Sequence, residues 1–551
     1  MNIIKYVTLS NSNDLFGLMG AGQKEIVDPI VSAMKVESTI TNKLIFRKQR
    51  RYCYFKFRDL TYGTKWASLI ILVITILMSC STKSVRKPVD SGPAPIDTVK
   101  ADVLVDCAIT QGPVMRIEGE NNASTTSDLP GDKTRSWLKS LHPHMIRLWI
   151  QLQYVYNKGA INYNYKISGT NAHLEDVLAY YSACTDSLLV VLSAYKGSAT
   201  WPVPQDAAFT QFLTNTLGYY KVKYPKISYV TVGNEPNHED EPMSSYYPAY
   251  QRFYRAVNRV NDSLDLQDNP IKICNGALTS NISGMLAYAD GFLKAYAEDT
   301  DPSKHLDAFC FHSYGESDRP AQLAGAGERI DSAMAANHLP KIPILVTEFG
   351  LVGGHGLPKG MTLDQTITME PAGQLTKAFY LYEGGISAMF NWCIHHKTIE
   401  YKSEIADLDE ATLYPYGNAI NFARAVSDRQ TRISASSDHI NTNGLGVHVL
   451  ASMGNGKGVA VLVWNYNWTN VDNSSGDFIV RVKNIPLSEF GSGKFASQIF
   501  LIDARHNNYS YDRSQNTLKA SVQGIENYAG SMDFNVHLEA NAVALILLTP
   551  Q

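Results

Sequence analysis

Short apolar runs alternate with longer amphipathic stretches between residues 100 and 428, and this alternation most constrains how the chain can fold. The runs have the length and β-branched character of buried strands. Strands that alternate with helices build a parallel sheet, either open and doubly wound or closed as a (β/α)8 TIM barrel. The eight expected strands are Val103–Ile109, Met145–Ile150, Leu188–Ala194, Ser228–Val232, Ile271–Asn275, Ala308–His312, Ile344–Thr347 and Ile386–Trp392.

Polar and acidic residues at the ends of these strands favour the closed barrel. Glu235 follows the run Tyr229–Gly233, and Glu348 ends the run that begins at Ile344. The two glutamates lie far apart in the sequence, but a barrel gathers the carboxyl ends of its strands on one face, where barrel enzymes keep their sites. The sequence therefore predicts a pair of carboxylates at the carboxyl end of an α/β barrel.

The pattern changes after Ser427, where short runs of alternating polar and apolar residues replace the strand–helix alternation. Turns rich in Gly, Asn and Ser separate these runs, as in the segment Gly454–Gly458. Short strands with tight turns are typical of a β-sandwich. We therefore expect a (β/α)8 barrel at 100–428, followed by a C-terminal β-sandwich at 429–551.

The N-terminal residues predict a signal segment that targets the protein to the cell envelope. Residues 1–66 carry a net charge of +6 and form a doubtful extension, which we exclude from fold reasoning. Residues 67–80 combine an uncharged apolar segment with Leu77-Met78-Ser79-Cys80, which resembles a bacterial lipoprotein signal core and lipobox. The alternative is an uncleaved anchor helix or a coincidental apolar run. With 81–99 as a linker, we expect a lipid on Cys80 to anchor the protein in the bacterial cell envelope, periplasmic or at the cell surface.

Charge and cysteine content exclude some classes of function. The net charge is −3 for the whole chain and about −9 once residues 1–66 are set aside, which argues against nucleic acid as a partner. Five cysteines of the folded region are widely spaced and lack histidines at ligand spacing, so we expect no metal and no cofactor, while a single disulfide stays open. These cysteines are Cys107, Cys184, Cys274, Cys310 and Cys393.

Two carboxylates that face each other across a sugar are the apparatus of glycoside hydrolysis. One must hold a proton while the other stays ionised, and their surroundings set that division. Glu235 lies in Asn234-Glu235-Pro236, where the amide of Asn234 can bind a sugar hydroxyl. The non-catalytic alternative for Glu235 is an acidic residue at a helix N-terminus. The non-catalytic alternative for Glu348 is a solvated carboxylate at a strand end.

Other polar residues at strand ends suit supporting roles. Arg147 lies inside an apolar run and needs a buried partner, either the nucleophilic carboxylate or an ordinary core acid. His312 and Tyr314 share one face, so Tyr314 can donate to the nucleophile and His312 can contact the sugar or the acid/base. His312 can equally be a satisfied core histidine.

Aromatic and histidine residues near the strand ends complete the candidates. Trp392 ends the last strand and can form the floor under a sugar ring, while Trp201 can wall a subsite. The adjacent pair His395-His396 resembles a metal site only superficially, because neighbouring side chains diverge in direction.

Together these motifs resemble the clan of retaining (β/α)8 glycosidases, and most closely glycoside hydrolase family 39, which includes β-xylosidases and α-L-iduronidases. The resemblance rests on Asn234-Glu235-Pro236 and Thr347-Glu348, with Arg147, His312-Ser-Tyr314 and Trp392 in support. The tail segments Val461–Tyr466 and Leu501–Asn508 are similar to that family's sandwich.

The resemblance implies double displacement at an oligo- or polysaccharide, with Glu348 as nucleophile and Glu235 as acid/base. Trp149 stands where well-known members of the family place a sugar-binding histidine, so Trp149 becomes a candidate substrate contact and the sugar specificity stays open. We expect a retaining, β-xylosidase-like hydrolase of plant or host glycans. The alternatives are an endo-acting or other-sugar glycosidase, a catalytically inactive glycan-binding surface lipoprotein, and an adhesive lipoprotein that works through its sandwich.

Overall fold

The structure, a computed structural model, describes residues 100–123, 129–157, 159–193, 207–279, 282–315, 318–351, 361–394, 412–468, 475–491 and 493–551. The lipobox with Cys80, the linker, Trp201 and His395-His396 lie outside these ranges. Within them, no helix combines the length and the apolar character that a membrane span requires. The five cysteines named above are all buried free thiols.

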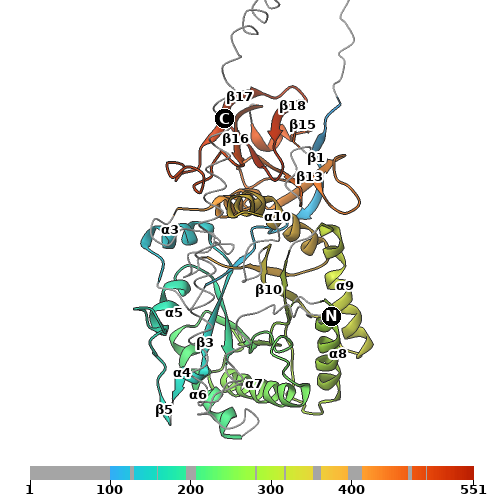
Figure 1. Ribbon diagram of the computed structural model, residues 1–551. Helices are drawn as coiled ribbons and strands as arrows, with labels where there is room; N and C mark the ends of the chain where they lie inside the picture. The colour runs from blue at the N-terminus through green and yellow to red at the C-terminus, as the bar shows by residue number, and fades with distance from the viewer. Residues whose placement is uncertain are drawn as a thin grey trace, which may run out of the picture. The chain divides into compact units, whose positions relative to one another are not determined.

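Eight parallel strands form the barrel, in the spatial order β8-β7-β6-β3-β2-β11-β10-β9. Isolated bridges between Cys274 and Ala308 and between Leu278 and Phe311 link the β8 segment to the β9 segment, so the barrel is nearly closed. The predicted (β/α)8 fold is confirmed (Figure 1). The strands are β2 (Glu120–Asn122), β3 (Met145–Gln151), β6 (Ser187–Ser193), β7 (Ile227–Val232), β8 (Lys272–Cys274), β9 (Phe309–Tyr314), β10 (Ile344–Gly350) and β11 (Ala388–Asn391).

Helices connect the strands along the outside of the barrel. They are α3 (Asp132–Leu141), α4 (Leu152–Val155), α5 (Leu174–Ser182), α6 (Ala207–Lys223), α7 (Met243–Ser263), α8 (Ile282–Glu298), η2 (Pro320–Gly325), α9 (Ala326–Ala336), α10 (Leu363–Glu383) and α11 (Pro415–Ser427). A short hairpin, β4 (Tyr156–Asn157) and β5 (Ala160–Ile161), follows α4. Helix α10 begins with a capping box, in which Thr362 Oγ1 accepts from Gln365 N and Gln365 Oε1 accepts from Thr362 N.

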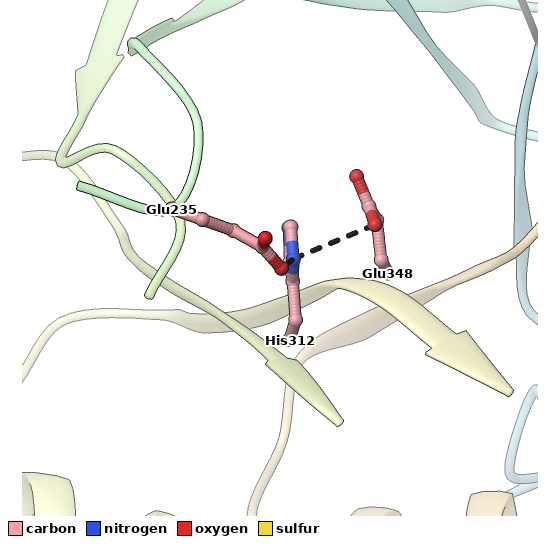
Figure 2. Close-up of side chains that lie close together, drawn as sticks. All are labelled: Glu235, His312 and Glu348. Atoms are coloured by element: carbon pink, nitrogen blue, oxygen red, sulfur yellow. Dashed lines mark hydrogen bonds and ion pairs between the residues drawn. The ribbon is translucent and has the colours of Figure 1, made fainter. Parts of the chain in front are cut away.

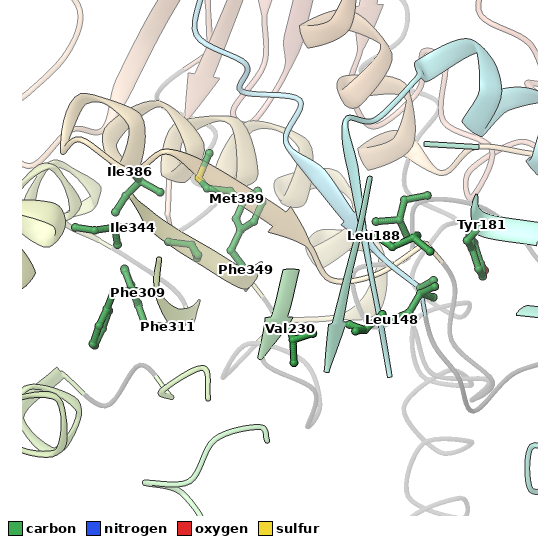
Figure 3. Packing of buried hydrophobic residues seen from close by; sticks show 14 of the residues in the cluster. Leu148, Tyr181, Leu188, Val230, Phe309, Phe311, Ile344, Phe349, Ile386 and Met389 are labelled. Atoms are coloured by element: carbon green, nitrogen blue, oxygen red, sulfur yellow. The ribbon is translucent and has the colours of Figure 1, made fainter. Parts of the chain in front are cut away.

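The alternation of side chains along each strand produces two apolar layers. Leu148, Leu188 and Phe311 point outward and pack under the helices, as Figure 3 shows for side chains from strands around the barrel. Residues of the opposite parity, such as Cys310 and Leu345, form a separate cluster that fills the barrel interior. Arg147, His312 and Tyr314 share this inward parity, which points their side chains into the carboxyl end of the barrel.

One expected barrel strand is wrong. Val103–Ile109 belongs to β1 (Val103–Pro113), which pairs antiparallel with β12 (Thr431–Ser437) and parallel with β15 (Gly476–Lys483) in the C-terminal sheet. The first barrel strand is instead the short polar β2, which contains no apolar run. Its small size explains the error, because a three-residue strand held by its neighbours has no periodic pattern of its own.

The second sheet has nine strands in the order β17-β16-β19-β14-β13-β12-β1-β15-β18 and is antiparallel except for the β1–β15 pair. Inward side chains from both halves of the sheet, such as Val480 of β15 and Val461 of β14, share one core, so the sheet folds over as a sandwich. Besides β1, it contains β12 (Thr431–Ser437), β13 (Gly446–Met453), β14 (Val459–Tyr466), β15 (Gly476–Lys483), β16 (Lys494–Ile502), β17 (Ala520–Asn527), β18 (Ser531–Leu538) and β19 (Val543–Pro550), with the turn α12 (Leu487–Phe490).

Helix α10 lies between the barrel and this sheet. The indole Nε1 of Trp464 on β14 donates to Thr376 Oγ1 on α10 over 2.8 Å, and both side chains are buried. His448 on β13 stacks on Trp464 with 5.3 Å between ring centroids. The sheet therefore fixes α10 against the barrel strands that carry the candidate site.

Candidate active site

A β-bulge aims Glu348 into the barrel. Along β10, Ile344 and Val346 point outward and Leu345 inward, which would place Glu348 on the outside. The β9–β10 register shifts between Val346 and Glu348, so the extra residue Thr347 reverses the alternation. Glu348 then points inward and Phe349 outward.

Two strong donors hold the Glu348 carboxylate. Arg147 Nη1 on β3 donates to Oε1 over 2.5 Å, and the Tyr314 hydroxyl on β9 donates to Oε2 over 2.7 Å. Burial and the charge of Glu348 raise the pKa of Tyr314 well above its usual value, so the phenol keeps its proton and remains a donor. Both oxygens of Glu348 are therefore bonded to donors on neighbouring strands.

The guanidinium of Arg147 is fully buried and joins three strands. Besides Glu348, it donates to Asn122 Oδ1 over 3.1 Å and to Asn234 Oδ1 over 2.6 Å. The sequence left open whether Arg147 pairs with the nucleophilic carboxylate or with a core acid, and the structure pairs it with Glu348.

Sequence reasoning missed Asn122. Its amide Nδ2 donates to the carbonyl oxygen of Thr347 over 2.9 Å, which satisfies a backbone group at the bulge. Asn122 therefore links the bulge to Arg147. The mistaken first strand hid this residue, whose one signal is a pair of adjacent asparagines in an otherwise polar segment.

The segment that carries Glu235 has an unusual backbone. Glu235 has φ of +48°, a left-handed conformation that is uncommon outside glycine and typical of functional sites when the surroundings enforce it. Glu235 N donates to the carbonyl of Ala277 over 2.8 Å. A Cβ on neighbouring Gly276 would approach the Val232 carbonyl oxygen to 2.4 Å, so only glycine permits this close packing of the loop after β8 against the Glu235 segment.

His312 lies between the two glutamates, as Figure 2 shows. Its Nδ1 is 2.7 Å from Glu235 Oε1 and 3.5 Å from Glu348 Oε2, and the ring is fully buried. Burial alone would raise the pKa of Glu235, but the hydrogen bond from His312 and nearby positive charge outweigh it, so the pKa lies below its usual value. Of the two roles left open for His312, the structure places it against the acid/base candidate.

Two tryptophans lie beside these charges at the carboxyl end of the barrel. The rings of Trp149 and Trp392 meet edge to face, with 5.4 Å between centroids. The guanidinium carbon of Arg147 lies 4.4 Å from the Trp149 ring centroid, a cation–π distance. Trp149 therefore covers Arg147, and both tryptophans are partly exposed, as a sugar platform requires.

Glu235, His312 and Glu348 are the one group of three possible metal ligands found in the described ranges, with ligand atoms within 4.8 Å of one another. Their partners do not suit a divalent cation. Arg147 already places a positive charge 2.5 Å from Glu348, and a second cation beside it would be repelled. His312 Nδ1 also faces Glu235 at hydrogen-bond distance.

No family model matches the sequence, and no curated protein matches it. Solved structures do match its fold. A glucosidase from Croceicoccus marinus is similar with a TM-score of 0.61 at 13% identity, covering 82% of this chain and 98% of its own. A GH39 enzyme from Xanthomonas axonopodis pv. citri has a TM-score of 0.58 at 16% identity, covering 82% and 97%.

A monomeric β-xylosidase from Caulobacter crescentus is also similar, with a TM-score of 0.58 at 14% identity, covering 81% of this chain and 99% of its own. Nearly the whole of each matched chain aligns, so the likeness includes the C-terminal sheet as well as the barrel. At such low identities the likeness concerns the fold alone. This chain therefore has the fold of those structures, a (β/α)8 barrel with a C-terminal β-sandwich.

Proposed function

We propose that the protein is a retaining glycoside hydrolase, with Glu348 as nucleophile and Glu235 as acid/base. The observation that most directly supports this proposal is the carboxylate pair at the carboxyl end of the barrel. Oxygens of the two side chains lie within 4.8 Å of each other. Retaining enzymes hold their carboxyl groups about 5–5.5 Å apart, whereas inverting enzymes need roughly 6.5–9.5 Å to admit a water. The short separation supports retention.

In the proposed mechanism each glutamate has its own step. Glu348, which accepts hydrogen bonds from Arg147 and Tyr314, attacks the anomeric carbon, while Glu235 gives its proton to the departing glycosidic oxygen. A covalent glycosyl–enzyme ester forms and the aglycone leaves as an alcohol. Glu235 then removes a proton from water, the resulting hydroxide attacks the anomeric carbon, and Glu348 is released.

The hydrogen bond from His312 suits the second of these steps. It favours the carboxylate of Glu235, which is the form that acts as base on water. In the first step Glu235 must carry a proton. A sugar bound over the site excludes water and adds to the burial that raises its pKa, so substrate and His312 act on Glu235 in opposite directions.

A β-xylosidase-like activity is the specific proposal, supported by the motifs and by the fold shared with a β-xylosidase and a GH39 enzyme. Trp149 and Trp392 form the walls that a sugar ring would contact. An endo-acting or other-sugar glycosidase uses the same carboxylates and differs in the shape of the cleft around them.

The deciding experiment measures hydrolysis of aryl β-xyloside, β-glucoside, β-galactoside, α-L-arabinoside and α-L-iduronide by the purified protein and by its Glu348→Ala variant. We expect release from one sugar, abolished in the variant, with retained configuration at the anomeric carbon by NMR. Inverted configuration would overturn the mechanism. Binding of glycans without turnover, on aryl glycosides and on polysaccharides alike, would overturn the enzyme and leave a glycan-binding protein.

We also propose that a lipid on Cys80 holds the protein in the bacterial cell envelope. Support comes from the apolar segment and the lipobox-like Leu77-Met78-Ser79-Cys80. Labelled palmitate fed to producing bacteria should enter the protein and be absent from Cys80→Ala. The matched control Cys53→Ala should keep the label, and equal labelling of all three proteins would contradict the anchor.

A further inference from the structure

Lys377 is a buried cation that the proposed reaction does not use. It lies in the middle of α10, and only 1% of its surface is exposed. Its Nζ donates to three backbone carbonyl oxygens, those of Ser313 at 3.0 Å, Gly315 at 3.1 Å and Gly350 at 2.8 Å. An ammonium has three N–H donors, so all of them are used and none is left for a ligand.

These three carbonyls lie beside the site. Ser313 and Gly315 flank Tyr314 in the chain, and Gly350 follows Glu348 by two residues. Lys377 thus contacts the backbone on both sides of the phenol that donates to the nucleophile, and on the strand that carries the nucleophile itself. It joins the carboxyl ends of β9 and β10.

The bulge in β10 explains why such a connection matters. The register between β9 and β10 shifts at Thr347, immediately before Glu348, and bulges disrupt the local ladder. After this interruption the strands pair again, with Glu348 opposite His312 and Gly350 opposite Tyr314. Lys377 adds a second connection between the strands on that far side, where the Tyr314–Glu348 contact of 2.7 Å is made.

We propose that Lys377 is a positioning residue, whose ammonium fixes the ends of β9 and β10 and so sets the Tyr314–Glu348 contact. The proposal rests on the proposed function for its effect on turnover. Burial lowers the pKa of Lys377 to about 7, whereas the three carbonyl oxygens favour the ammonium, because only the charged form has an N–H donor for each of them.

The chain contains a matched control. Lys221 on α6 is also buried, at 2% exposure, and its Nζ donates to the carbonyl oxygens of Pro225 at 2.9 Å and Ile227 at 2.7 Å. Burial likewise lowers its pKa, to about 8. Ile227 begins β7, so Lys221 serves the amino end of the barrel, away from the glutamates.

The experiment compares Lys377→Met with Lys221→Met. Both should lower the thermal midpoint, because each leaves buried carbonyls without a donor. Only Lys377→Met should lower kcat, by roughly 10- to 100-fold with KM little changed, since small misplacements at a reacting centre cost that much. Equal kcat in the two variants would overturn the inference.

Crystal structures give a readout that does not depend on activity. In Lys377→Met the distance between the Tyr314 hydroxyl and Glu348 Oε2 should lengthen, while in Lys221→Met it should stay near 2.7 Å. An unchanged distance in Lys377→Met overturns the inference even if kcat falls. If the unaltered protein hydrolyses no glycoside, the proposed function fails, and this distance alone decides the positioning role. Should Lys377→Met not fold, Lys377→Gln, which keeps two N–H donors, is measured by the same two readouts.

Discussion

Two clusters of buried charge lie at opposite ends of the same barrel. At the carboxyl end are Glu348 with Arg147 and Glu235 with His312. At the amino end, Arg116 contacts both Glu118 and Glu120, with Nε 3.1 Å from Glu118 Oε1 and Nη1 3.3 Å from Glu120 Oε1. Both clusters contain an arginine paired with a buried glutamate, so a buried, ion-paired carboxylate does not distinguish them.

The difference lies in the bonding of one carboxylate, that of Glu235. At the amino end, the second oxygen of Glu118 accepts from Ser427 and that of Glu120 accepts from the backbone of Met145. At the carboxyl end, Glu235 Oε1 meets His312, while Oε2 has no partner in the described part of the chain and the side chain is 22% exposed. Glu235 thus has an oxygen left to take up or release a proton, and it lies beside Glu348, whose two oxygens accept from Arg147 and Tyr314. At the amino end, both oxygens of Glu118 and of Glu120 are bonded within the fold.

The largest expected contrast is in turnover. Glu348→Gln keeps the size of the side chain but removes the nucleophile, so kcat should fall by roughly 10⁴-fold or more. The equivalent change at the other end, Glu118→Gln, should leave kcat close to that of the unaltered protein. Aryl glycoside kinetics on both variants check this, and a comparable loss in Glu118→Gln would erase the distinction between the clusters.

The arginines should differ in the same way. Arg147→Met leaves Glu348 buried without its cation, which should lower the free energy of unfolding by about 3–5 kcal/mol and reduce kcat as well. Arg116→Met should destabilise the protein while kcat is kept. Urea unfolding monitored by tryptophan fluorescence, with kinetics on the same samples, separates the two effects. Full activity in Arg147→Met would contradict the expected difference between the two arginines.

A smaller effect concerns pH. His312→Phe removes the hydrogen bond that favours the carboxylate of Glu235, so the pKa of Glu235 should rise. Glu235 then keeps its proton to higher pH, and the alkaline limb of the kcat/KM profile should move upward. Tyr314→Phe removes a donor to Glu348 instead and should leave that limb in place. If the alkaline limb of His312→Phe stays at the same pH or moves to lower pH, the assignment of Glu235 as the acid is contradicted.

The smallest effect is on stability. Burial raises the pKa of Glu120 to about 7, against about 4.3 in an unfolded chain. The folded state therefore holds this proton more tightly, and its contribution is present below about pH 4.3 and lost as pH rises through 7. Glu120→Gln should flatten the pH dependence of unfolding in that window. Glu235, whose pKa is lowered, contributes in the opposite direction, so Glu235→Gln should alter only the acid side. If the free energy of unfolding of Glu120→Gln changes with pH as it does in the unaltered protein, the amino-end cluster is not desolvated.

The sequence was sufficient for most of the barrel because long apolar runs such as Met145–Gln151 and Ile344–Gly350 have a strand pattern of their own. The candidate site followed, since polar side chains at strand ends must converge in a closed parallel barrel. Glu235, Glu348, Arg147, His312 and Tyr314 do lie together.

Other features depend on tertiary contacts that leave no local pattern. The strand β2 is three polar residues, held by its neighbours, whereas β1 has a strong apolar alternation yet joins the other sheet. The bulge at Thr347 depends on the register with β9, and strict alternation would have pointed Glu348 the wrong way. The sequence analysis did not single out Lys377, and the structure shows that it is buried.

The pairing of β1 has a consequence for biosynthesis. Its antiparallel partner β12 begins at Thr431 and its parallel partner β15 at Gly476, so the entire barrel is made between β1 and its neighbours. At roughly 5–20 residues per second, β1 leaves the ribosome on the order of tens of seconds before either partner exists. An apolar strand with both edges open is prone to pair with other chains. A gene fragment that ends near residue 428 therefore carries β1 without either of its partner strands.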